Sequence, residues 1–231
     1  MKLEVGVPPS GAPNSLAGRI AGMREKIGVA ARAAGREPSS IALVGVTKKQ
    51  PRESVVEAIE AGLSDIAESY VQEARAKLVG LPPVRKHFIG HVQTNKAKAI
   101  VELFDVVQSV DRLEAGRALA HAAQTQGKRI AVLIQVNVSP SERFGVSPED
   151  APALAEALRG SEGLDVVGVM AMGPLTTDRA AVEAAFRCAA QAFERVGGTT
   201  LSLGMSGDWE EAIRCGSTML RIGTTIFGAR A

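Results

Sequence analysis

Hydrophobic positions recur every three or four residues near the start of the chain. Leu16, Ile20 and Met23 follow this spacing, which predicts an amphipathic helix over residues 14–34 that ends before Gly35. Beyond it, short runs rich in valine, isoleucine and leucine alternate with longer stretches rich in alanine, glutamate and arginine. The pattern therefore predicts an initial helix followed by a repeated strand–helix unit.

This alternation continues to the carboxyl terminus. Strands are predicted over eight apolar runs, at residues 41–47, 63–68, 86–90, 105–110, 129–138, 164–172, 199–206 and 218–228. Helices are predicted after the first seven runs, at residues 52–60, 71–78, 95–103, 112–125, 149–158, 178–196 and 208–215. Continuous apolar runs are typical of strands in a parallel sheet that is buried on both faces.

Strict strand–helix alternation favours a closed (β/α)8 barrel, because right-handed crossovers join the strands in parallel. Barrels of this kind take about 250 residues, and the chain has 231. We therefore expect a single α/β barrel domain over residues 1–231, with the N-terminal helix as an additional outer element. The alternative is a doubly wound open sheet, but no GxGxxG motif follows the first predicted strand and no linker divides the chain.

Composition narrows the class of protein. Hydrophobic residues make up 45% of the chain, which excludes disorder as a description of the whole. Lys and Arg number 27 against 25 Asp and Glu, so the net charge of +2 predicts no general attraction for nucleic acid or anionic membrane. Two cysteines, Cys188 and Cys215, provide neither a disulfide framework nor a CxxC spacing. Without a signal-peptide or membrane-spanning run, we expect a cytoplasmic protein.

Lys48 is the first candidate for chemistry. The active sites of such barrels lie at the carboxyl ends of the strands, and Lys48 directly follows the run VGVT. Its neighbour Lys49 should point the other way, because alternate residues of a strand face opposite sides. Desolvation lowers the pKa of a lysine and frees its amine to form a Schiff base. The alternative is a solvated pair of lysines that ends a strand.

The loops after strands seven and eight are where barrels often bind phosphate. Ser206 follows the seventh run, and Gly223 with Thr224 lies in the eighth, where a glycine allows an anion to approach the backbone. Asp208 and Glu211 make a helix N-cap pattern. The structural alternative is an ordinary helix cap together with glycines that close the barrel.

Arg221 precedes Gly223 by two residues, so it should share the same strand face and place a guanidinium inside the barrel. An arginine that faces a pyridine nitrogen would keep that nitrogen unprotonated. Alternatively, Arg221 pairs with a carboxylate in a polar layer of the barrel. His87 and His91 are four residues apart, but no acidic residue follows at ligand spacing, so we expect no metal site.

Five motifs, in order along nearly the whole chain, resemble those of one known family. They are VGVTKKQP (44–51), AESYVQE (67–73), HFIGHVQTNK (87–96), LSLGMSGDWEEAI (201–213) and GSTMLRIGTTIFGAR (216–230). The last two are long and specific. On these motifs the chain is identified as a member of the pyridoxal phosphate homeostasis protein family, also called the proline synthetase co-transcribed family.

The resemblance implies a barrel like the N-terminal domain of alanine racemase, with pyridoxal 5′-phosphate held on Lys48 as an internal aldimine. It also implies that the phosphate is held by Ser206, Gly223 and Thr224, and that Arg221 lies near the cofactor ring. Secondary pocket candidates by the same matching are Asn137, Met170, Ser69 and Tyr70. The chain departs from the family pattern at Ala67 and Ser69, which replace a glycine and an asparagine, and in the compressed segment 139–145.

The length of the chain bears on whether such a protein is an enzyme. Alanine racemase completes its site with a further domain and a partner subunit, whereas this chain ends at Ala231. We therefore expect a monomeric, non-enzymatic protein that buffers or delivers pyridoxal phosphate, with pyridoxal phosphate-dependent apoenzymes as recipients. One alternative is a minimal amino-acid racemase with Tyr70 or His91 as a second base. Another is a Schiff-base aldolase that uses Lys48 without a cofactor.

Overall fold

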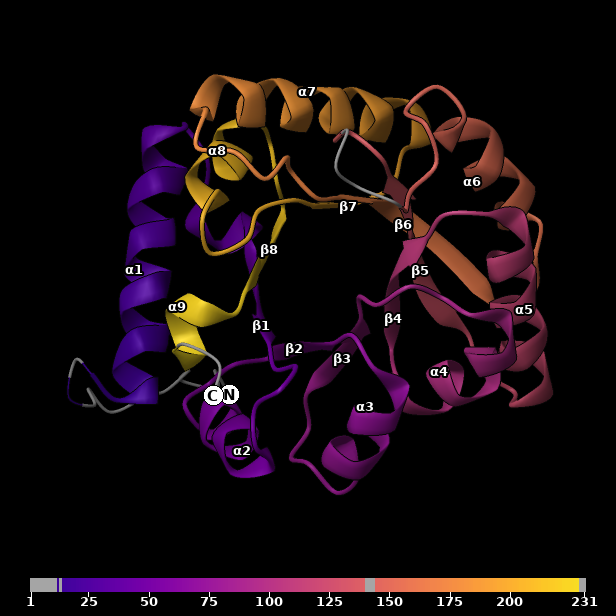
Figure 1. Cartoon of the computed structure of the whole chain (residues 1–231), viewed down its shortest axis with the longest axis horizontal. Helices are drawn as coiled ribbons and strands as arrows, with labels where there is room; N and C mark the ends of the chain where they lie inside the picture. The colour runs from indigo at the N-terminus through magenta and orange to yellow at the C-terminus, as the bar shows by residue number, and fades with distance from the viewer. Residues whose placement is uncertain (1–11, 13, 140–143, 229–231) are drawn as a thin grey trace, which may run out of the picture.

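Eight parallel strands form a closed barrel at the centre of the protein (Figure 1). The computed structural model describes residues 12, 14–139 and 144–228. The strands pair in chain order, and β1 closes the ring against β8. They are β1 (Ala42–Val46), β2 (Asp65–Glu68), β3 (Arg85–Phe88), β4 (Val106–Val110), β5 (Ile130–Val136), β6 (Leu164–Ala171), β7 (Thr200–Ser202) and β8 (Met219–Ile222). The predicted (β/α)8 barrel is confirmed.

Helices cover the outside of the barrel. They are α1 (Leu16–Ala33), α2 (Arg52–Glu60), α3 (Val71–Leu78), α4 (Ala97–Leu103), α5 (Leu113–Thr125), α6 (Ala151–Arg159), α7 (Arg179–Val196), α8 (Trp209–Arg214) and α9 (Thr224–Phe227), with 3-10 turns η1 (Pro38–Ser40) and η2 (Thr94–Lys96). The predicted N-terminal helix is present as α1, which packs against α2, α8 and α9 (Figure 1).

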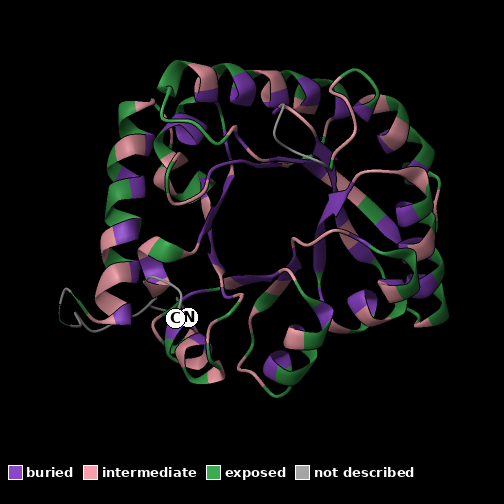
Figure 2. Cartoon of the chain, in the orientation of Figure 1, coloured by how far each residue is buried: buried purple, intermediate pink, exposed green. Residues whose placement is uncertain are grey.

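Most strand residues are buried, as the continuous apolar runs predict, and the exposed ones, Arg85 of β3 and Asp165 of β6, lie near the amino ends of their strands. All residues of β4, for example, are buried. One large hydrophobic core fills the layer between the strands and the inward faces of the helices, while exposed residues lie on the outer helix faces (Figure 2). Alternate strand residues point into the barrel and form two smaller clusters there, one of Val44, Ala67 and Met219 and one of Val106, Leu133 and Met170.

Two glycines allow neighbouring segments of the backbone to approach closely. Gly168 has a φ of +152° at a register shift between β5 and β6, and a Cβ there would lie 1.9 Å from the carbonyl oxygen of Thr200. A Cβ on Gly90 would lie 2.0 Å from the carbonyl oxygen of Ser69. Gly90 thereby holds the loop after β3 directly against the loop after β2, at the mouth of the barrel.

The last predicted strand, 218–228, is wrong in its second half. The strand β8 stops at Ile222, and α9 follows it because the N–H groups of Ile226 and Phe227 donate to the carbonyl of Gly223 at 3.0 and 2.9 Å. Short apolar runs do not distinguish strand from helix by periodicity alone. Two other predicted elements are longer than the observed ones: the predicted strand 199–206 exceeds β7, and the predicted helix 95–103 begins within the 3-10 turn η2, two residues before α4.

Both cysteines are free. Burial raises the pKa of Cys188 and of Cys215, so each thiol is neutral at neutral pH. None of the helices within residues 14–139 and 144–228 is long and apolar enough to cross a membrane.

Candidate functional site

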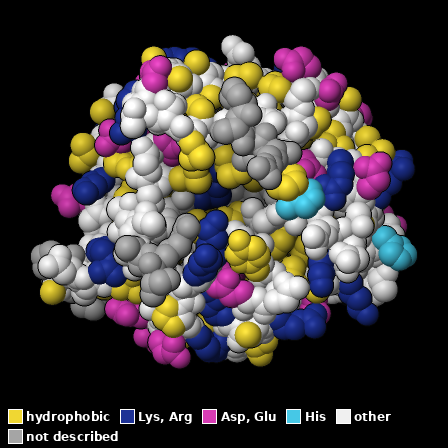
Figure 3. Space-filling model, viewed as in Figure 1, with side chains coloured by type: hydrophobic (Ala, Val, Ile, Leu, Met, Phe, Trp, Pro, Cys, Tyr) yellow, Lys and Arg dark blue, Asp and Glu magenta, His cyan; other side chains and the backbone are white. Residues whose placement is uncertain are grey.

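A cavity of about 250 Å³ opens at the carboxyl ends of the strands. We call it the mouth cavity. Figure 3 views this face, where Lys and Arg side chains lie in and beside a central hollow among hydrophobic side chains. The residues predicted from the sequence that line it are Lys48, Ser69, Met170, Ser206, Arg221, Gly223 and Thr224. Residues far apart in the chain are thus brought together where the barrel predicts a site.

Part of the lining was not predicted from the sequence. It consists of Val46, Ile89, Met172, Met205 and Gly207. Val46 and Met172 lie two residues from Lys48 and Met170, so strand alternation gives a signal that could have found them. The three methionines make this wall apolar and adaptable in shape.

Lys48 lies in a turn that a second lysine holds in place. The ammonium of Lys77, on α3, lies 2.7 Å from the carbonyl oxygen of Thr47 and 3.0 Å from that of Gln50, so it donates to both ends of the turn. Within the turn, Lys49 has a φ of +62° and its N–H donates to Glu73 Oε1 at 2.5 Å. The backbone on each side of Lys48 is therefore fixed by α3.

Glu68 completes this network beneath the turn. Its Oε1 lies 2.7 Å from Lys77 Nζ and accepts a hydrogen bond of 2.6 Å from the hydroxyl of Thr47. The side chain is fully buried, and its Oε2 has no hydrogen-bond partner among the described residues. Burial raises the pKa of Glu68 above its ordinary value, although the hydrogen bonds from Lys77 and Thr47 oppose the shift.

The raised pKa of Glu68 predicts a pH effect on stability. The folded state binds this proton more tightly than the unfolded state, so the contribution is complete below the unfolded pKa, about 4.3, and is lost as pH rises through the folded pKa. We expect the free energy of unfolding of the wild type, relative to that of Glu68→Gln, to fall as pH rises from 4 towards neutrality. Urea titrations over this range measure it, and a constant difference would contradict it.

Ser206 connects the loop after β7 to the segment after β8. Its Oγ accepts hydrogen bonds from the N–H groups of Gly223 at 3.3 Å and Thr225 at 3.4 Å. The hydroxyl hydrogen remains available, since it has no acceptor within the described part of the chain. Gly223 has a negative φ and no close contact at the position of a Cβ, so its contribution is an N–H group rather than a special backbone conformation.

The predicted helix cap at Asp208 is wrong in its chemistry. The Asp208 side chain makes no cap hydrogen bond to α8; its Oδ1 instead accepts from the N–H of Met205 at 2.5 Å and so closes the loop before the helix. Glu211 pairs with Arg179 at 3.1 Å and Arg214 at 3.2 Å. Asp208 therefore stabilises the loop that carries Ser206 directly, and Glu211 is linked to it through Arg179, whose Nη1 also donates to the carbonyl of Gly207 at 2.7 Å.

Arg221 points into the barrel, as its place on the strand predicts, and is 3% exposed. Its Nη1 donates to the carbonyl and the hydroxyl of Ser202 at 2.8 and 2.6 Å, and its Nη2 donates to the carbonyl of Ala171 at 2.9 Å. Among the described residues no carboxylate pairs directly with Arg221, so the predicted alternative of such a pair is wrong. Burial lowers the pKa of Arg221 to about 10, with the charge of Asp208 opposing, so the guanidinium stays protonated at neutral pH.

Asn137 and Tyr70 lie outside the lining of the mouth cavity. The Asn137 side chain turns towards its own loop, where Oδ1 accepts from the N–H of Ser139 at 3.1 Å. Tyr70 precedes α3 at the rim and is 53% exposed. His91 stacks on Phe144, with ring centroids 4.1 Å apart, and likewise does not line the cavity. Of the segment 139–145, residues 140–143 lie outside the described residues.

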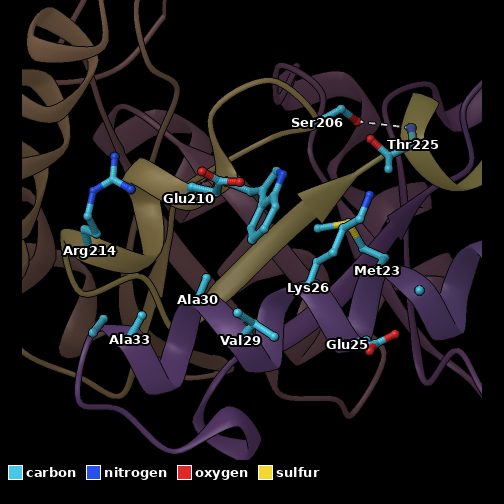
Figure 4. A pocket seen from close by; sticks show the side chains of 13 residues that line it. Met23, Glu25, Lys26, Val29, Ala30, Ala33, Ser206, Glu210, Arg214 and Thr225 are labelled. Atoms are coloured by element: carbon cyan, nitrogen blue, oxygen red, sulfur yellow. Dashed lines mark hydrogen bonds between the residues drawn. The ribbon is translucent and has the colours of Figure 1, made fainter.

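A larger groove of about 930 Å³ lies on the outer wall between α1, α8 and α9. Figure 4 shows α1 along one side of it and Ser206 with Thr225 at its far end. Its charged side chains, among them Lys26, Glu210 and Arg214, are exposed. Because the groove has no buried amine or guanidinium, the mouth cavity is the better candidate site. The sequence motifs gave no signal for the groove.

The chemistry of the mouth cavity fits pyridoxal phosphate. An amine, a hydroxyl with a free hydrogen and a buried guanidinium line one apolar-walled space, and these groups suit an aldehyde, a phosphate and a pyridine nitrogen respectively. Among the described residues, no group of three His, Cys, Asp or Glu side chains is placed to hold a metal ion.

Comparison with known proteins gives concordant results. The sequence model of the alanine racemase N-terminal domain matches residues 23–231. The pyridoxal phosphate homeostasis protein of Pseudomonas aeruginosa is 43% identical over 222 residues, which cover 94% of this chain and 96% of that protein. The one from Escherichia coli K12 is 37% identical over 228 residues, covering 94% and 97%. The structure of PipY from Synechococcus elongatus with pyridoxal phosphate bound aligns with a TM-score of 0.81 at 32% identity, covering 93% of this chain and 100% of PipY.

Proposed function

The chain belongs to the pyridoxal phosphate homeostasis protein family, and on that premise we propose that it binds pyridoxal 5′-phosphate in the mouth cavity and buffers or delivers it. The single observation that carries the proposal is the meeting of Lys48, Ser206 and Arg221 in one cavity. Each of these groups matches a different functional group of the cofactor. The recipients are apoenzymes that depend on pyridoxal phosphate.

Lys48 is the attachment point. Its amine condenses with the aldehyde carbon of pyridoxal phosphate, a C=N bond forms and one water leaves, giving an aldimine that water reverses. The turn around Lys48 is held by Lys77 and Glu73, which restricts where the amine can reach. A covalent but reversible bond suits a protein that stores a reactive aldehyde and releases it.

Ser206 and its neighbours hold the phosphate. The Ser206 hydroxyl donates its free hydrogen, and the backbone at Gly223 and Thr224 borders the same side of the cavity. Arg221 also lines the cavity, and we propose that the N–H groups not used by Ser202 and Ala171 face the ring, where an unprotonated pyridine nitrogen would accept. A ring without a proton on its nitrogen is a weak electron sink, which disfavours chemistry at the α-carbon of an amino acid.

Removing the donor at Ser206 has a measurable consequence. We expect Ser206→Ala to weaken cofactor binding by about 1–3 kcal/mol, because it deletes a hydrogen bond to a charged phosphate; Thr224→Ala should act in the same direction. Equilibrium titration followed by absorbance measures the dissociation constant. Ser40→Ala, in the exposed turn η1, is the matched control and should leave it unchanged. Unchanged affinity in Ser206→Ala would contradict the phosphate assignment.

The lining of the cavity favours a carrier over a catalyst. Its titratable groups within the described residues are Lys48 and Arg221, whereas a racemase needs a second acid or base on the opposite face of the cofactor. Tyr70 and His91 lie elsewhere. The barrel is closed and leaves no edge strand to be covered by another copy, so we propose that the protein acts as a monomer.

The proposal is tested by loading the protein with pyridoxal phosphate and removing the free cofactor by gel filtration. We expect a visible absorbance band that stays with the protein and declines when a cofactor-free apoenzyme is added, as that enzyme gains activity. Single amino-acid enantiomers in deuterated water should keep their α-proton. A colourless protein would contradict binding, and rapid α-proton exchange would contradict the carrier role.

A further inference from the structure

A chain of hydrogen-bonded polar side chains crosses the interior of the barrel and ends at Arg221. It runs from Asp65 on β2 to His87 on β3, Gln108 on β4 and Ser202 on β7. His87, Gln108 and Ser202 are all 0% exposed. The interior of such barrels is normally filled with branched apolar residues. The contacts proposed for pyridoxal phosphate therefore do not explain why these hydrogen-bonded polar side chains lie in the barrel interior.

The guanidinium of Arg221 fixes the direction of every hydrogen bond in the chain, because it donates and never accepts. Arg221 Nη1 donates to Ser202 Oγ at 2.6 Å, so the Ser202 hydrogen goes to Gln108 Oε1 at 2.7 Å. The amide nitrogen of Gln108 then faces His87 Nδ1 at 2.9 Å and donates to it. A ring nitrogen that accepts carries no hydrogen, so the hydrogen of His87 lies on Nε2.

The far end of the chain is closed by a group that only accepts. His87 Nε2 donates to Asp65 Oδ1 at 3.0 Å. Burial alone would raise the pKa of Asp65, but the hydrogen bonds from His87 and Ser64 outweigh it and the pKa is lowered, so the carboxylate is ionised at neutral pH. A cation at one end and an anion at the other allow all four bonds to form at once. Replacing any middle member leaves a buried neighbour unpaired.

From this geometry we infer that Gln108 is a positioning residue, which acts through Ser202 to hold Arg221 in one orientation towards the mouth cavity, and that His87 and Asp65 fix the Gln108 amide. The identity of the ligand in this inference rests on the proposed function, whereas the chain of hydrogen bonds does not depend on it. Both N–H groups of Arg221 Nη1 donate to Ser202, and one N–H group of Nη2 donates to the carbonyl of Ala171. The donors that remain select a ligand ring with a nitrogen acceptor.

The first test needs no cofactor. Nitrogen-15 NMR of the histidine rings at neutral pH reports which nitrogen carries the hydrogen. We expect Nε2 for His87 in the wild type. In Gln108→Glu we expect a hydrogen on Nδ1 in addition to the one on Nε2, because carboxylates at positions 108 and 65 then face both ring nitrogens and only accept. A wild-type His87 with its hydrogen on Nδ1, or a Gln108→Glu variant without a hydrogen on Nδ1, would contradict the proposed hydrogen-bond chain. This holds whether or not the protein binds pyridoxal phosphate.

The second test asks whether Gln108 positions Arg221. Gln108→Met cuts the chain, and Gln135→Met is the matched control, since Gln135 is also buried, lies on the neighbouring strand β5 and donates to the Phe144 carbonyl instead. We expect Gln108→Met to move the NMR signal of the Arg221 Nε–H in the cofactor-free protein. In the loaded protein it should shift the absorption maximum and weaken binding about tenfold, which is ~1.4 kcal/mol, while borohydride still labels Lys48.

The outcomes separate the two claims. Equal shifts in Gln108→Met and Gln135→Met, or no shift in Gln108→Met, would overturn the positioning role. A wild type that takes up no pyridoxal phosphate would contradict the proposed function, and the Arg221 signal in the cofactor-free protein would still decide the positioning role. If Gln108→Met does not fold, the His87 tautomer in Gln108→Glu and the Arg221 signal in Ser202→Ala provide the same decision.

Discussion

Replacing Lys48 by alanine is expected to abolish the visible absorbance of the protein loaded with pyridoxal phosphate and its retention through gel filtration. The other groups around the cavity make only non-covalent contacts, and those are lost within the time of the separation. Lys48 is also the lysine that lines the mouth cavity among the described residues. The measurement is the absorption spectrum of wild type and variant after identical loading.

The matched control for this prediction is Lys49→Asn. Lys49 has a φ of +62°, which asparagine tolerates better than most residues, and its side chain does not line the cavity. We expect this variant to load like the wild type. Full colour in Lys48→Ala, or loss of colour in Lys49→Asn with the fold intact, would contradict the assignment of Lys48.

Replacing Lys77 by methionine is expected to destabilise the protein by about 3–5 kcal/mol at neutral pH, the cost of leaving one partner of a buried ion pair alone. The side chain of Lys77 is 6% exposed and that of Glu68 is 0% exposed. The loss also removes two hydrogen bonds that hold the turn around Lys48. Urea denaturation measures the change, and loading with pyridoxal phosphate should become weaker in parallel.

Two further variants identify the cause. Arg75 lies on α3, like Lys77, and Arg75→Met removes its exposed ion pair with Glu102 of α4. We expect this variant to change the free energy of unfolding by less than about 1 kcal/mol. Adding Glu68→Gln to Lys77→Met should recover part of the loss, because no buried carboxylate remains unpaired. A cost for Lys77→Met no larger than that for Arg75→Met would contradict the role of the network.

Much of this architecture is predictable from the sequence because it depends on local pattern. Continuous apolar runs and strict alternation are sufficient for a parallel barrel, and the barrel in turn places Lys48 and Ser206 at the same end. Strand alternation also places Arg221 inside. Strand alternation does not predict where the Asn137 side chain points, because its direction depends on the loop after β5 rather than on the strand.

The interior polar chain is the part that local pattern could not provide. His87 and Gln108 each adjoin a short apolar run, next to Lys86 and Ser109 respectively, and their spacing in the sequence indicates no common partner. Gln108 and Ser202 lie on β4 and β7, which are not neighbours in the sheet, so only closure of the barrel brings them within 2.7 Å. Contacts across a barrel interior depend on its register and not on sequence separation.

Reduction with borohydride followed by peptide mass mapping tests the central claim most directly. The reagent converts a C=N bond between a lysine and pyridoxal phosphate into a stable amine, so it marks the attachment point permanently. We predict that the loaded wild type carries one label per chain, on the peptide that contains Lys48. A label on any other lysine with Lys48 unmodified, or no label on a coloured protein, would contradict the claim that Lys48 holds the cofactor.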